Sequence, residues 1–146
     1  MAIDLSAKSI ASAKARCPGA EFHCQDIRAP FPVTNAGVIV ASLSMHYFAS
    51  DATVALAARI RDTLRPAGIL LCRLNSTNDH HYGASGHAEV EPRFYLVDDE
   101  PKRFFDRDAV TDLFAKGWIM LSIGELVIDR YDHLKTAWEV ILEKAA

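Results

Sequence analysis

Two acidic residues and a histidine–tyrosine pair are the side chains best placed to do chemistry. Asp4 and Asp26 each follow a short apolar stretch, and His46 and Tyr47 follow a longer apolar run. A carboxylate at the tip of a strand can accept hydrogen bonds from a ribose diol. A histidine with an unperturbed pKa titrates near neutral pH and can orient a substrate or act as a base. These residue types therefore predict a nucleoside-binding edge with His46 and Tyr47 close to the reacting groups.

Each of these residues also has a simpler interpretation. Asp4 can be a solvated carboxylate at the end of a strand. Asp26 can form an Asx turn before the proline-containing loop 27–35. His46 can pack beneath a ligand or bond a backbone group without taking part in chemistry. The sequence leaves both interpretations open for each residue.

The polar stretch 75–91 contains three of the six histidines, His80, His81 and His87. His80 and His81 are adjacent, the nearest cysteine, Cys72, falls inside a predicted strand, and the spacing matches no known zinc pattern. We therefore expect no metal site. Long polar loops are uncommon unless they are functional, so we expect this stretch to be a mobile lid over the substrate.

Hydrophobic patterning predicts an alternating α/β fold. Continuous apolar runs predict buried parallel strands, and apolar residues spaced by four predict helices. Two stretches near the end of the chain are joined by a short polar turn, and the second alternates between apolar and polar residues, as in an antiparallel hairpin. The fold class predicted is α/β: a Rossmann-like, mostly parallel sheet flanked by helices and ending in that hairpin. The predicted strands are 2–4, 20–24, 37–43, 68–72, 94–97, 118–128 and 134–142, and the predicted helices are 7–16, 51–64 and 107–116, capped by Ser6, by Ser50 or Asp51, and by Asp106.

Length and composition fit one domain over residues 1–146. The net charge of -3, with no basic stripe, argues against a nucleic-acid partner. The three cysteines form no C-x-x-C pattern, which favours a reducing, cytoplasmic location over a disulfide framework. No apolar run reaches the ~18 residues that a membrane span needs, and no signal peptide is visible. The expected partner is therefore a small molecule.

Five segments in this order resemble the class I S-adenosylmethionine-dependent methyltransferases. The resemblance covers essentially the whole chain and depends on the order and spacing of the segments, since no single motif is specific. It includes a helix end and turn that often read Leu-x-Pro-Gly-Gly in that family, where Ala67 replaces the first glycine. The segments are AIDLSAKSIASAKA, FHCQDI, VIVASLSMHYF, LRPAGILLCRLNS, and KRFFDRDAVTDLF followed by GWIMLSI.

The resemblance implies a cofactor, a reaction and site residues. The cofactor is S-adenosylmethionine, and the reaction is methyl transfer to a small-molecule acceptor. His46 and Tyr47 would face the reacting methyl group as candidate catalytic residues. The residues implied in cofactor binding are Asp4 and Leu5 at the ribose, Asp26 and Ile27 at the adenine, and Ser42.

The chain departs from the family because it contains no strand followed by Gly-x-Gly-x-Gly. We expect a domain that begins one βα unit late, binds S-adenosylmethionine weakly or not at all, and is impaired in methyl transfer. The alternative is a non-catalytic binding or interaction module on the same scaffold. A dehydrogenase remnant would share Asp4, but Asp26 and the terminal hairpin count against it. In the family, the absent strand lies between those predicted at 2–4 and 37–43, so we expect unpaired strand edges and a homo-oligomer.

Overall fold

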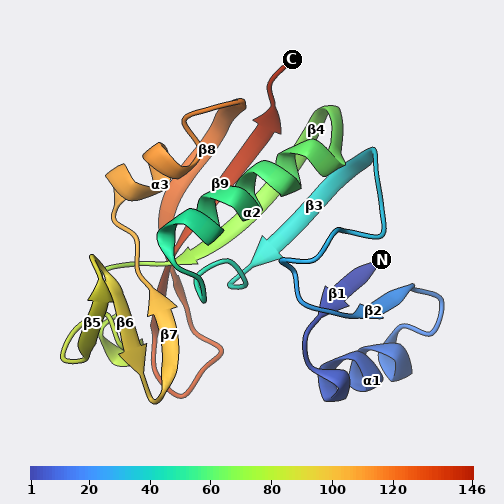
Figure 1. Ribbon diagram of the computed structural model, residues 1–146. Coiled ribbons are helices and arrows are strands. Elements are labelled where there is room, and N and C mark those ends of the chain that lie inside the picture. Colours follow the sequence, from blue (N-terminus) through green and yellow to red (C-terminus); the bar gives the residue numbers. More distant parts are fainter. The chain divides into compact units, whose positions relative to one another are not determined.

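The computed structural model describes residues 1–146, which divide into two compact units. Unit 1 comprises Met1–Val33 and unit 2 comprises Thr34–Ala146. Figure 1 shows the elements of both units along the chain. The single domain expected from the sequence stays a prediction, and each unit is described by itself.

Unit 1 is a βαβ unit. Strands β1 (Ala2–Asp4) and β2 (Phe22–Cys24) pair in parallel, and helix α1 (Ala7–Arg16) connects them. The predicted cap is confirmed, because the Ser6 hydroxyl accepts a hydrogen bond from the Ser9 amide at 3.2 Å. Ile10 is the buried residue of the helix, which agrees with its predicted position against the sheet.

Unit 2 is built on a four-stranded sheet of order β3-β4-β9-β8. Strands β3 (Ala36–Ser42) and β4 (Leu64–Asn75) pair in parallel. Strand β9 (Lys135–Lys144) runs antiparallel to β4 and forms a hairpin with β8 (Trp118–Ile128). The predicted fold class is therefore confirmed, including parallel strands flanked by helices and the antiparallel hairpin at the end of the chain.

Helices α2 (Ser50–Thr63) and α3 (Arg107–Leu113) contribute apolar side chains to the core of unit 2. The predicted four-residue spacing on α2 is confirmed, because Leu56, Ile60 and the following Leu64 are at most 3% exposed. Figure 1 shows α2 lying across the sheet. Further buried side chains of this core come from β4, β9, α3 and β8, among them Leu70, Cys72, Leu74, Val140, Leu142, Val110 and Trp118.

A second, three-stranded antiparallel sheet follows β4 in unit 2. It consists of β5 (Ala88–Glu91), β6 (Phe94–Val97) and β7 (Glu100–Arg103), and a 3-10 turn, η1 (His80–Tyr82), precedes it. Figure 1 shows this sheet beyond the carboxyl ends of β3 and β4. Gly83 follows the turn with φ of 104°, and an added Cβ there would lie 2.6 Å from a Val97 methyl carbon, so the position requires glycine.

The structure corrects several predicted elements. The expected loop 75–91 is shorter, because Asn75 ends β4 and Ala88–Glu91 forms β5. Neither Ser50 nor Asp51 caps α2: the cap position is Ala49, which makes no side-chain cap hydrogen bond. Strand β7 was not predicted. Strand β4 begins earlier than predicted, and helix α3 ends earlier.

Two parallel strands each have one edge without a strand partner. Strand β1 is hydrogen-bonded only to β2, and β3 is an edge strand next to β4. Val38 and Val40 on β3 are 63% and 64% exposed, although their apolar run is typical of an interior strand. Open apolar edges favour pairing with another strand. The expected homo-oligomer stays a prediction.

None of the helices is long and apolar enough to cross a membrane.

Candidate functional site

The carboxylates of unit 1 lie at one edge of its small sheet. Asp4 ends β1 and pairs with Cys24, the last residue of β2, and Asp26 follows two residues later. The Gln25 amide donates to the Asp4 carbonyl at 3.0 Å, which extends the pairing toward Asp26. The carboxyl ends of parallel strands are where α/β proteins bind ligands. The structure therefore brings Asp4 and Asp26 to the edge where the sequence predicts them.

Both carboxylates accept hydrogen bonds from residues two positions further along the chain. One oxygen of Asp4 (Oδ1) accepts a hydrogen bond from the Ser6 amide at 2.7 Å. Asp26 accepts hydrogen bonds from the Arg28 guanidinium at 2.6 Å and from the Arg28 amide at 2.8 Å. These bonds, the side-chain one first, lower the pKa of Asp26 to about 2. The Asx-turn interpretation of Asp26 is therefore confirmed, and Asp26 is an ionised acceptor whose oxygens Arg28 already engages.

The other implied cofactor residues of unit 1 lie on its surface. Leu5 is 73% exposed, and its carbonyl accepts a hydrogen bond from the Cys24 thiol at 3.5 Å. Ile27 is half-buried in the turn that Asp26 opens. Their backbones therefore frame the edge that carries the two carboxylates.

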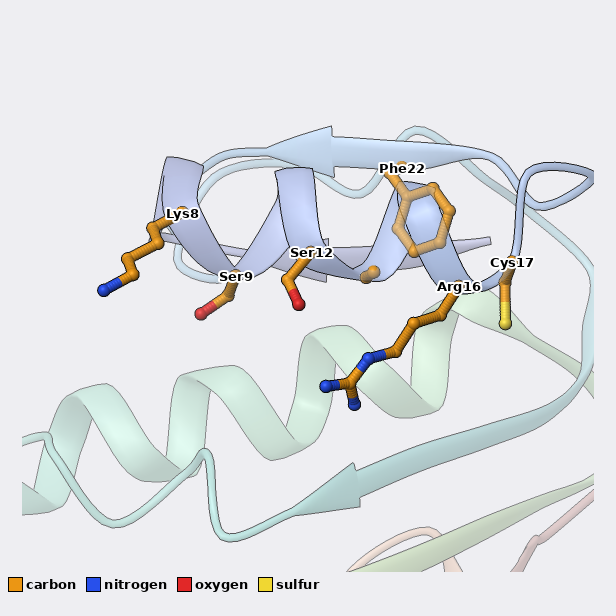
Figure 2. Close-up of a pocket in the computed structure, with 7 residues that line it drawn as sticks. Lys8, Ser9, Ser12, Arg16, Cys17 and Phe22 are labelled. Atoms are coloured by element: carbon orange, nitrogen blue, oxygen red, sulfur yellow. The ribbon is translucent and has the colours of Figure 1, made fainter.

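A surface hollow of about 500 Å³ lies on α1 and β2. Figure 2 shows Lys8, Ser9, Ser12 and Arg16 projecting from one side of α1, with Phe22 of β2 beside them. Neither Asp4 nor Asp26 lines this hollow. It is distinct from the carboxylate edge, and none of the site residues predicted from the sequence lines it.

The predicted residues of unit 2 follow β3. Ser42 is exposed and pairs with Arg73 of β4. His46 is 4% exposed and Tyr47 is 41% exposed, with their ring centroids 4.2 Å apart. Tyr47 is therefore at the surface while His46 lies beneath it.

Burial makes His46 a neutral imidazole. Burial, followed by the charges of Lys135 and Lys102, lowers the pKa of His46 to about 3. The imidazole is therefore a hydrogen-bonding group at neutral pH, and it is a weaker base than an unperturbed histidine. The pKa near neutrality assumed from the sequence alone does not apply to this position.

This burial predicts a specific loss of stability in mild acid. The pKa of His46 is 6.5 in the unfolded chain and about 3 in the folded one, so the unfolded state binds more protons between these values and stability falls as pH falls. Lowering the pH from 7.5 to 5.5 should reduce the unfolding free energy by about 1.4 kcal/mol through this residue. Urea unfolding at both pH values measures the loss, which His46→Phe should remove. An equal loss in that variant would contradict the prediction.

Arg103, which the sequence did not single out, holds the segment around His46. Its amide donates to the His46 carbonyl at 2.7 Å, and its Nε donates to the Phe48 carbonyl at 3.2 Å. Its guanidinium pairs with Glu91, whose carboxylate accepts the Ser50 amide at 3.0 Å. Arg103 is 8% exposed. It therefore fixes the chain from His46 to the start of α2.

A second unpredicted ion pair anchors the stretch after β4. The Asp79 carboxylate accepts a hydrogen bond from Lys135 at 2.6 Å and another from the Thr136 amide at 3.0 Å. Asp79 is 1% exposed, and Lys135 also lies 4.8 Å from the centre of the Tyr82 ring. The first part of the expected lid is thus tied to β9, and the mobility of the lid stays a prediction.

The histidines of the polar stretch do not gather with other potential ligands. His81 stacks on His133, with centroids 5.0 Å apart. No three histidine, cysteine or carboxylate side chains come together in a way that could hold a metal ion.

The comparisons with known proteins agree with the fold. Residues 1–68 match the family model described as a methyltransferase domain. A search of curated proteins gave no match. Among solved structures, a methyltransferase dependent on S-adenosylmethionine from Methanosarcina mazei is similar at 15% identity, with a TM-score of 0.79 over 98% of this chain and 80% of that one.

Two similar structures contain S-adenosylhomocysteine. The first is 1,6-didemethyltoxoflavin-N1-methyltransferase from Burkholderia thailandensis, at 16% identity and a TM-score of 0.73 over 99% of this chain. The second is the N-methyltransferase NodS from Bradyrhizobium japonicum, at 12% identity and a TM-score of 0.70 over 99% of this chain. The chain spans 60% and 65% of their lengths, less than two thirds in each case. By fold and by the match of its first 68 residues, the chain resembles a class I S-adenosylmethionine-dependent methyltransferase.

Proposed function

We propose that this chain takes part in methyl transfer from S-adenosylmethionine to a small-molecule acceptor. The observation that carries the proposal is the position of Asp4 and Asp26 at the carboxyl end of the parallel β1–β2 pair. Similar structures bind S-adenosylhomocysteine and, in one case, the small molecule 1,6-didemethyltoxoflavin. Those small molecules are said only of those proteins, and the methyl acceptor of the present chain is not identified.

The chain offers acceptors for a nucleoside at this edge. The Ser6 amide occupies Oδ1 of Asp4, which leaves Oδ2 for a ribose hydroxyl. Asp26 and the Ile27 backbone would meet the adenine, where an amino group has to share the carboxylate with Arg28. These groups fit a nucleoside, and the partial occupation of Asp26 favours weak binding.

The cofactor supplies an activated methyl group on a sulfonium when it is bound. The protein's own contribution is to hold the acceptor in line with that methyl and to exclude water. His46 and Tyr47 follow the end of β3 by four and five residues and are the proposed residues on the acceptor side. Because His46 is neutral, it would orient the acceptor by hydrogen bonding, and proton loss would accompany or follow the transfer.

Binding of S-adenosylmethionine to the 146-residue chain should be weak. A hydrogen bond to a charged group contributes about 1.5–3 kcal/mol, whereas micromolar affinity requires about 8 kcal/mol. We expect a Kd near millimolar, about tenfold weaker in Asp4→Asn. Amide shifts of Leu5 and Ile27 in a nuclear magnetic resonance titration measure both affinities, and Glu21→Gln, a change of the same charge before β2, is the control.

Two results of that titration would count against the proposal. Low-micromolar affinity would contradict the expected weak binding. Unchanged Leu5 and Ile27 amides at saturating cofactor would contradict the cofactor site itself. The second result would favour a non-catalytic binding module. The ion pair between Asp26 and Arg28 supports this alternative, because it already occupies the carboxylate.

A further inference from the structure

The hollow of about 500 Å³ on α1 and β2 is a cavity that the proposed function does not use. Lys8, Ser12 and Arg16 line it at intervals of four residues, so they follow one side of the helix. Figure 2 shows the three side chains projecting from that side. The two cationic residues are separated by eight positions, or about 12 Å along the helix axis, with the Ser12 hydroxyl between them. Their long side chains can therefore converge on one ligand over Ser12.

Helix α1 is positively charged along its length. Its sequence, AKSIASAKAR, contains Lys8, Lys14 and Arg16 and no carboxylate. Lys14 and Arg16 lie in the last turn, where the helix dipole favours a cation. Lys8 lies in the first turn, where the dipole disfavours one. The helix therefore has an electrostatic cost that an anion bound in the hollow would offset.

The carboxylates of unit 1 do not balance these charges. Asp4 is hydrogen-bonded to a backbone amide at 2.7 Å, Glu21 to a histidine at 2.7 Å, and Asp26 to an arginine at 2.6 Å. None of the three lines the hollow. Within unit 1, the charged ends of Lys8 and Arg16 form no ion pair. The cations of the hollow are therefore free to bind an anion from solution.

The lining groups define the chemical class of that anion. A phosphate monoester has about 1.5–2 negative charges near pH 7 and three acceptor oxygens, which match two cations and a hydroxyl. Arginine binds phosphate oxygens in a bidentate manner, and lysine binds them as a point charge. The half-buried Phe22 ring provides an apolar wall beside these groups. The hollow therefore suits a phosphate group attached to a small flat ring.

We propose that this hollow binds a small organic phosphate. The phosphate group contacts Lys8, Ser12 and Arg16, and the ring packs on Phe22. The site is separate from the proposed cofactor edge, because neither cofactor carboxylate lines it. It is therefore a second ligand site, and its occupation does not depend on methyl transfer.

The test compares three probes on the 146-residue chain by following the amides of Ser12 and Phe22 by nuclear magnetic resonance. Phenyl phosphate has both the charge and the ring, inorganic phosphate lacks the ring, and phenol lacks the charge. We expect phenyl phosphate to bind with a Kd near millimolar, about tenfold more tightly than either other probe, and more weakly as salt rises. Arg16→Gln should weaken it about tenfold. Lys14→Gln removes the same charge from the same helix outside the hollow and should weaken it less than about twofold.

Alkylation of two thiols gives a second measurement of occupancy. Cys17 lines the hollow, whereas Cys24 is exposed outside it. Saturating phenyl phosphate should slow the reaction of Cys17 with iodoacetamide and leave that of Cys24 unchanged, and Arg16→Gln should remove this protection.

Three results would overturn the proposal. Equal weakening by Arg16→Gln and Lys14→Gln would assign binding to the overall charge of the helix. Equal affinity for phenyl phosphate and inorganic phosphate would exclude the contact with Phe22. Unchanged Ser12 and Phe22 amides with every probe would exclude the site itself.

Discussion

Replacing Asp79 by alanine is expected to lower the free energy of unfolding by about 3–5 kcal/mol. The Asp79 side chain is 0% exposed and that of Lys135 is 10% exposed, with 2.6 Å between Nζ and Oδ2. Removal of the carboxylate leaves a buried ammonium without its counter-charge, and the Thr136 amide loses its acceptor. Urea unfolding gives the free energy directly, and Tm should fall by roughly 10–15 °C.

The double variant tests the cause of this loss. Lys135→Met in the Asp79→Ala background removes the stranded charge, so it should restore part of the lost stability. Glu125→Ala, which removes a carboxylate that bonds Ser76 and Asn78 on the same stretch, is a matched control with a smaller expected effect. Additive losses from Asp79→Ala and Lys135→Met would contradict the pairing as the source of stability.

Replacing Arg103 by methionine is expected to cost about 2–3 kcal/mol of unfolding free energy. The change keeps most of the stem and removes the guanidinium that bonds the Phe48 carbonyl and pairs with Glu91. The Glu91 carboxylate is about one third exposed, and solvent there reduces the cost. The Ser50 amide keeps its carboxylate partner, so α2 should remain helical. Urea unfolding measures the loss and circular dichroism follows the helix.

A double-mutant cycle isolates the ion pair from the other bonds of Arg103. Glu91→Gln alone and combined with Arg103→Met gives the coupling free energy between the two side chains. We expect a positive coupling of about 1 kcal/mol. A coupling of zero would assign the whole effect to the carbonyls of Phe48 and Pro92 and to the Phe94 ring, over which the guanidinium lies at 4.7 Å.

Elements with a strong local pattern could be predicted from the sequence. The helix at Ala7–Arg16 and the strand at Trp118–Ile128 have the predicted bounds. Strand β7 could not be predicted, because Glu100–Arg103 contains no alternation of apolar residues. It forms because Asp98 and Asp99 adopt positive φ and turn the chain back on β6. Its place at the edge of the three-stranded sheet tolerates Pro101.

Only some residues of the candidate site could be predicted from the sequence. Asp4 and Asp26 could be found because a strand tip is a local feature. Asp79 and Lys135 are 56 residues apart, and Arg103 reaches Phe48 over 55 residues. Pairs of this kind have no spacing that marks them, since the fold alone brings them together. Asn75 looked like the first residue of a polar loop, whereas in the structure it ends β4 and is 1% exposed.

The three cysteine thiols of this protein differ in their exposure to oxidants and electrophiles. Cys72 is buried in β4, and burial raises the pKa of its thiol to about 12. Cys17 and Cys24 are exposed, and exposed thiolates are the forms that oxidants and electrophiles attack. Damage therefore begins in unit 1. Because Cys24 pairs with Asp4 in the β1–β2 register, an adduct there would crowd the carboxylate edge while the core of unit 2 stays chemically intact.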